Sequence, residues 1–69
     1  MWYAIYDNVT KEVNGAGFLA NPDSYILPDG CSMSAGQSGD IPNDLITNGE
    51  TVVYNYIYNT ETQLVEAKA

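Results

Sequence analysis

The chain has 69 residues, of which nine are acidic, with two lysines, no histidine and a net charge of −7. Because nucleic-acid binding depends on lysine and arginine, this charge excludes nucleic acids and anionic membrane surfaces as expected partners. A single cysteine makes no internal disulfide, and without histidine there is neither a structural zinc site nor a Ser-His-Asp or Cys-His catalytic centre. We therefore expect a protein that is not an enzyme and uses no cofactor or metal.

A chain of this length makes one β domain, residues 1–69, with a small core. Such a domain buries roughly 60% of the surface that its unfolded chain exposes, so its stability is marginal without a partner. No stretch reaches the about 18 apolar residues of a membrane span, and no basic and apolar secretion signal opens the sequence. We expect synthesis in a reducing cytoplasm and assembly into a homo-oligomer or onto a larger protein.

The first elements in chain order form a hairpin. The aromatic segment 2–6 favours a β-strand, the polar run 7–11 has the composition of a hairpin connection, and Val13–Leu19 predicts the return strand. Gly15 and Gly17 within that return strand indicate a β-bulge or a close backbone approach.

The middle of the chain is richer in turn residues. Residues 21–23 predict a turn, 24–27 a short strand, and 27–30 a second turn with proline at its second position. From 31 to 44 the sequence is rich in Ser, Gly, Asn and Asp, which predicts a long irregular loop.

The last third of the chain predicts two more hairpins. Asn48-Gly49 lies between the expected strands 45–47 and 51–58, and this dipeptide favours a two-residue type I′ turn. Residues 59–62 predict the next turn and 63–67 the closing strand. In total we expect an all-β fold, an antiparallel sheet or sandwich of about five to six short strands in hairpins with a long central loop.

One short motif occurs twice. Ile-Tyr-Asp/Asn-x-x-Thr-x-x-Val begins at Ile5 and again at Ile57. An Asp or Asn at the start of a turn accepts hydrogen bonds from the backbone that follows, so two matching hairpin turns explain the recurrence better than gene duplication does.

The aromatic residues are the candidate interaction site. Strand alternation places Tyr54, Tyr56 and Tyr58 on one face of the strand 51–58, and Trp2 and Tyr6 on one face of the first strand. The opposite faces are not plainly polar, so both faces need cover, and a chain this small builds one core. We expect these five residues to meet a neighbouring subunit.

Two alternatives concern the loop 31–44. It can fold over the aromatic face within the same chain. Its acids Asp40 and Asp44, with Asp29 before it, could also supply carboxylate chemistry or bind calcium, but their spacing is not that of an EF-hand and solvated turn residues are the simpler interpretation. Cys31 has no cationic neighbour in sequence, which favours a packed, unreactive thiol.

The segment from Trp2 to Val13 resembles the first hairpin of many small structural proteins of tailed bacteriophages, which often begin Tyr-x-x-Tyr-Asp-x-x-Thr-Gly. Lys11 stands where glycine is usual in that pattern. The resemblance implies a virion protein, such as a capsid decoration or cement protein that docks on the major capsid or tail protein, and it carries over no functional residues. Alternatives are a small tail or fibre component, or an acidic DNA mimic that inhibits a host nuclease or restriction protein.

Overall fold

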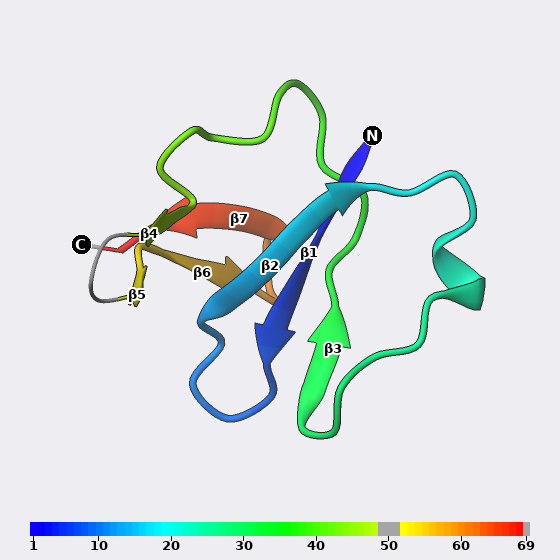
Figure 1. Cartoon of the computed structure of the whole chain (residues 1–69), viewed down its shortest axis with the longest axis horizontal. Coiled ribbons are helices and arrows are strands. Elements are labelled where there is room, and N and C mark those ends of the chain that lie inside the picture. The colour runs from blue at the N-terminus through cyan, green and yellow to red at the C-terminus, as the bar shows by residue number, and fades with distance from the viewer. Residues whose placement is uncertain (49–51, 69) are drawn as a thin grey trace.

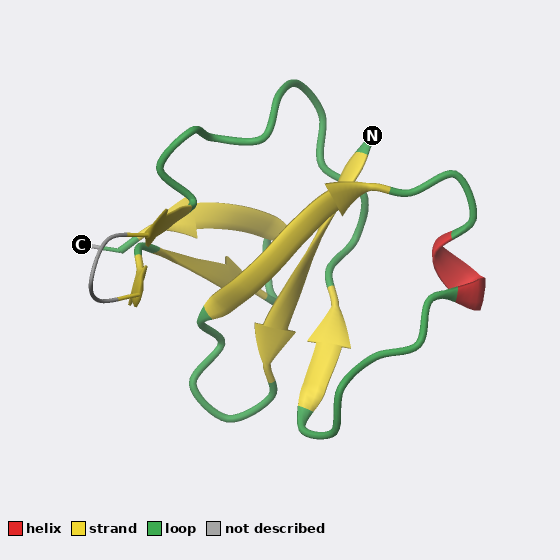
Figure 2. Ribbon diagram, viewed as in Figure 1, coloured by secondary structure: helices red, strands yellow, loops and turns green. Residues whose placement is uncertain are grey.

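The computed structural model describes residues 1–48 and 52–68 and confirms an all-β fold. Strands dominate the ribbon, and a single helical turn projects at one end (Figure 2). No helix among the described residues has the length and hydrophobicity needed to cross a membrane. The described elements are β1 (Trp2–Asp7), β2 (Val13–Phe18), η1 (Pro22–Ser24), β3 (Cys31–Met33), β4 (Ile46–Asn48), β5 (Val52–Tyr54), β6 (Tyr56–Asn59) and β7 (Leu64–Ala67).

The strands pair antiparallel in three small sheets, with orders β2-β1-β3, β4-β5 and β6-β7. In Figure 1 the β1–β2 hairpin crosses in front of the β6–β7 hairpin, and both β1 and β2 contact β6. The β1–β2 register shifts between Ile5 and Tyr6, which leaves Asn14 as an extra residue on β2. This is the β-bulge that the sequence predicted for the return strand.

The core lies between the β1–β2 hairpin and the β6–β7 hairpin. Val13 has no exposed surface, and a buried valine contributes about 1.5–3 kcal/mol relative to an exposed one. Few residues are so well covered, as expected for a chain of this size. The buried cluster consists of Trp2, Ala4, Val13, Leu45 and Tyr58, with Tyr6, Ile41, Tyr56 and Val65 packed against it.

The repeated motif forms the same turn in both hairpins. The Asp7 carboxylate accepts hydrogen bonds from the backbone amides two and three residues on, at 2.7 and 3.0 Å, and the Asn59 carboxamide does so at 2.9 and 3.2 Å. Each turn ends on a residue in the left-handed region, Lys11 with φ 66° and Gln63 with φ 61°. Glycine adopts this conformation without strain, which explains why it is usual at the position of Lys11.

The expected strand 24–27 is wrong. Pro22 fixes a φ suited to a helical turn, and the amide of Tyr25 donates to its carbonyl oxygen at 3.1 Å. Ser24 reinforces this turn with a hydroxyl bond to the Asn21 carbonyl oxygen at 3.0 Å. Ser24 therefore ends a 3-10 helix, and residues 25–27 follow it without pairing with a strand.

The interpretation of 31–44 as an irregular loop is wrong at its start, because β3 pairs with β1 there, with Met33 opposite Ile5. Beyond β3 the chain continues alongside β1. The Ser34 amide donates to Ala4 at 2.8 Å, and Trp2 and Gln37 exchange backbone hydrogen bonds of 3.0 and 2.7 Å. The segment 34–37 thus continues the pairing along this edge of β1 from within the same chain.

The expected strand 51–58 is interrupted at Asn55, between β5 and β6. The hairpin before it is confirmed, since β4 pairs with β5. Asn48 pairs with Val52 at the end of β4. Gly49, and with it the predicted turn type, lies outside the described residues.

Gln37 joins the two hairpins. Its side-chain amide donates to the Gln63 carbonyl oxygen at 3.0 Å and accepts from the Val65 amide at 3.1 Å, while its own backbone pairs with Trp2 of β1. A second bond from the same Nε2, 2.9 Å to the Ala35 carbonyl oxygen, fixes the orientation of the amide. Gln37 is 5% exposed, so this contact between β1 and β7 is shielded from water.

Candidate protein-docking surface

The five aromatic residues expected at an interface do not share one surface. Trp2 and Tyr58 are buried, 4% and 6% exposed, and Tyr6 stacks on Tyr58 with ring centroids 4.7 Å apart. Tyr56 is half-buried against the same core, and Tyr54 is 39% exposed. The expected interface is therefore corrected to exclude Trp2 and Tyr58, because the aromatic faces of β1 and β6 pack against each other and form the core.

Tyr54 and Tyr56 line a shallow hollow of about 440 Å³. The Tyr56 hydroxyl donates to Asp44 Oδ1 at 2.9 Å, and this bond raises the pKa of Tyr56 above its ordinary value of 10.0. A phenol with a raised pKa is a weaker acid, so the Tyr56 hydroxyl stays protonated at neutral pH. The remaining lining residues are Asn55, Ala67 and Lys68.

A second hollow lies on the outer face of the β2-β1-β3 sheet. Gly17 is paired with Tyr3, and Gly15 with Ile5, so the two glycines form part of the floor beside these side chains. Neither glycine has a positive φ. A Cβ at Gly17 would meet no atom within 4 Å, and one at Gly15 would lie 3.8 Å from the nearest Ile5 atom, an ordinary contact. Neither backbone strain nor crowding requires glycine at positions 15 and 17. The absence of side chains at these positions leaves the outer face of the sheet hollow.

The segment 19–30, which we call the arm, completes this groove. It leaves the end of β2, passes through η1 and returns to β3 (Figure 1). The groove has a volume of about 290 Å³ and an apolar lining from both sheet and arm. Large apolar side chains nearby are exposed, with Phe18 at 62% and Ile26 at 90%. The lining residues are Tyr3, Ile5, Asn14, Gly15, Ala16, Gly17, Leu19, Tyr25 and Pro28.

The groove adjoins an open sheet edge. The backbone groups of Trp2 and Ala4 face the segment 34–37, so their β2 partners, Phe18 and Ala16, turn their own peptide groups away from β1. Both residues are exposed, and β2 is the outer strand of its sheet. Near its start β2 is less open: a bridge joins Glu12 to Ile57, and both β4 and β6 contact β2.

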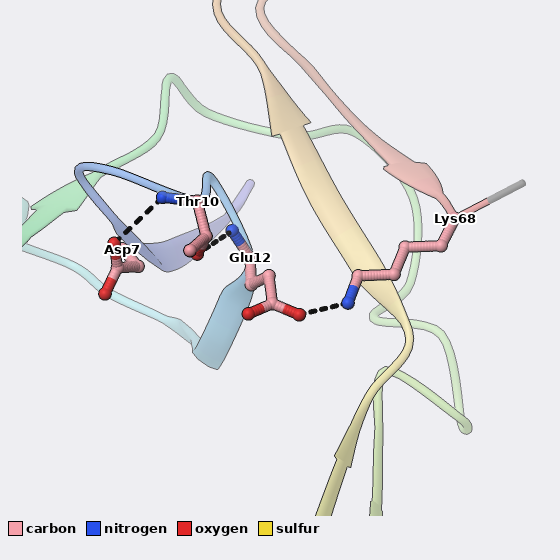
Figure 3. Close-up of polar contacts among 4 residues, drawn as sticks. All are labelled: Asp7, Thr10, Glu12 and Lys68. Atoms are coloured by element: carbon pink, nitrogen blue, oxygen red, sulfur yellow. Dashed lines mark hydrogen bonds and ion pairs between the residues drawn. The ribbon is translucent and has the colours of Figure 1, made fainter.

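Electrostatics around the groove are acidic. Lys68 pairs with Glu12 just before β2, as Figure 3 shows, and Lys11 Nζ donates to the Asn8 carbonyl oxygen at 2.9 Å. These are the only two cationic side chains of the sequence, and the arm adds two carboxylates and no cation. Among the described carboxylates, Asp7 lies at the end of β1 and Glu66 lies in β7, and the others lie outside the strands.

The described parts of the chain contain no assembled metal site. No group of three or more Cys, Asp or Glu side chains there is placed to hold a metal ion. Cys31 is half-buried in β3 and accepts a hydrogen bond from Asn14 Nδ2 at 3.4 Å. No family model, curated protein or solved structure matches the chain.

The groove and its exposed neighbours were not predicted from the sequence. Gly15 and Gly17 were the available signal, since they alternate on one face of the strand opposite Tyr3 and Ile5. They were interpreted only as a sign of a β-bulge or a close backbone approach. Tyr25 lines the groove because the arm folds back over the sheet, and no local sequence pattern predicts this path of the arm.

Proposed function

We propose that this chain is a non-enzymatic structural protein that docks on a larger protein assembly. The observation that carries the proposal is the apolar groove over the glycine floor, which Tyr3, Leu19 and the exposed Tyr25 line. Ile26, the next residue of the arm, is also exposed. Contiguous apolar surface with a polar surround is typical of protein-interaction sites. We propose this surface for docking because the aromatic face expected to bind a partner is largely buried in the core.

The assembly that we propose is the virion of a tailed bacteriophage, in which the chain is a capsid decoration or cement protein. Support comes from the Tyr-x-x-Tyr-Asp-x-x-Thr hairpin and from the left-handed Lys11 at the position where the phage pattern has glycine. The same turn recurs at Asn59, so turn chemistry contributes to the likeness along with ancestry. A tail or fibre position, and a homo-oligomer on the particle, belong to the same proposal.

The test is whether the chain belongs to purified particles. Virus particles from cells that produce the chain are separated on a density gradient, and the chain is quantified against the major capsid protein by mass spectrometry. We expect a fixed copy number that matches the particle symmetry. Absence from particles, together with a stable, folded monomer in analytical ultracentrifugation, would overturn the proposal.

A further inference from the structure

We propose that the β2 edge and the adjoining groove form a strand-addition site, which binds an extended segment of a partner protein. This inference rests on the proposed docking function and names the chemistry of its partner. The segment has large apolar side chains at alternate positions and lysine or arginine between them.

β2 lacks the features that normally prevent another strand from pairing with an open sheet edge. Proteins blunt edge strands with charges, proline, short length or bulges. β2 has six residues, Val-Asn-Gly-Ala-Gly-Phe, with no charge and no proline, and its bulge at Asn14 leaves the stretch from Gly15 to Phe18 regular. The opposite edge of the sheet belongs to β3, which has only three residues.

The second argument is the position of the groove relative to that edge. A strand added to β2 places every second side chain on the outer face of the sheet, in line with Gly15 and Gly17. Those side chains enter the groove of about 290 Å³ that the glycines leave open and Tyr25 borders. Backbone bonds to Ala16 and Phe18 then give affinity, and the groove gives selectivity for apolar residues at alternate positions.

The third argument concerns the occupant. If a second copy used its own β2, it would present Gly15 and Gly17 to the groove and leave it empty. Two copies would also bring together two chains of charge −7 each. A different strand, apolar toward the groove and basic elsewhere, satisfies both the shape and the acidic surround.

The experiment uses the full chain labelled with ¹⁵N and a synthetic peptide in which leucine alternates with lysine. One control peptide has serine for leucine, and another has glutamate for lysine. We expect the leucine-lysine peptide to slow hydrogen exchange at the amides of Ala16 and Phe18 and to shift those of Gly15 and Gly17. Both control peptides are expected to bind about tenfold more weakly or worse.

Gly17→Leu fills the groove, and since a Cβ there meets no atom within 4 Å, the variant is expected to fold. Its matched control, Thr60→Leu, adds the same side chain to the exposed β6–β7 turn. We expect Gly17→Leu to weaken peptide binding about tenfold or more, and Thr60→Leu to leave it unchanged. Equal binding by both variants, or peptide-induced shifts that map to the Tyr54 hollow, would overturn the site.

Particle association separates this inference from the proposed function. Retention of Gly17→Leu on particles at the wild-type copy number would overturn strand addition while leaving docking intact. A dimer of the free chain that Gly17→Leu abolishes would overturn the choice of partner, because a second copy would then fill the groove. Loss from particles of Gly17→Leu, but not of Thr60→Leu, supports the inference.

Discussion

Replacement of Gln37 by leucine tests whether the two hairpins depend on one side chain for their attachment. The substitution removes the three amide hydrogen bonds, to the Ala35 and Gln63 carbonyl oxygens and from the Val65 amide, and keeps a buried side chain of similar size. Each bond contributes about 1 kcal/mol net, and β7 is only partly buried, so water recovers some of the loss. We expect the free energy of unfolding to fall by about 2–3 kcal/mol.

A loss of this size is a large share of the stability of a small domain, and it should lower the melting temperature by roughly 10–20 °C. Trp2 is the only tryptophan of the chain and is buried, so its fluorescence reports unfolding in urea directly. Ser38→Ala, at the exposed neighbouring position, is the control and should change little. If Gln37→Leu unfolds within about 0.5 kcal/mol of the wild type, the claim that this amide joins the hairpins is refuted.

Two further predictions concern the matching turns. Gln63→Gly should stabilise the fold by about 0.5–1 kcal/mol in the same urea assay, because the strain relieved at φ 61° exceeds the cost of the added entropy of the unfolded chain. Gln63→Ala keeps the Cβ and should leave the stability unchanged. Equal effects of the two substitutions would contradict this prediction. Backbone hydrogen bonds lower the pKa of Asp7 below its ordinary 3.8. Its stabilisation is therefore present above that pH and lost as pH falls through the folded value. Asp7→Asn should preserve the turn, as Asn59 does, and reduce the loss of stability on acidification; an unchanged acid profile would contradict this.

The hairpin turns could be predicted from sequence because their chemistry is local. An Asx side chain, two following amides and one left-handed residue lie within a few positions of one another, so Asp7 and Asn59 are recognisable without knowledge of the fold. The all-β class follows in the same way from aromatic and β-branched runs separated by turns.

The assignment of faces could not be predicted, because it depends on contacts between distant segments. Alternation correctly placed Trp2 and Tyr6 on the same side of the first strand, but it does not reveal that this side faces the core instead of a neighbouring subunit. The side is covered by Tyr58 and Leu45, which are distant in sequence. Ser34 and Gln37 pair with the free edge of β1 through backbone groups and the Ser34 hydroxyl, and such polar contacts leave no hydrophobic pattern in the sequence.

Gly15 and Gly17 provide the strongest physical argument for a docking role. Glycine inside a strand costs about 0.5–1 kcal/mol relative to alanine, and a domain this small has little stability to spare. Neither position has a positive φ, and neither lacks room for a Cβ. Stability alone would therefore favour larger residues at both sites. The proposed strand addition requires an open groove for a partner side chain, and this requirement favours glycine at both positions despite the loss of stability. Alanine at both positions should accordingly raise the free energy of unfolding, measured by Trp2 fluorescence, and weaken docking. If the glycines had a purely structural role, alanine would lower the free energy of unfolding and also weaken docking.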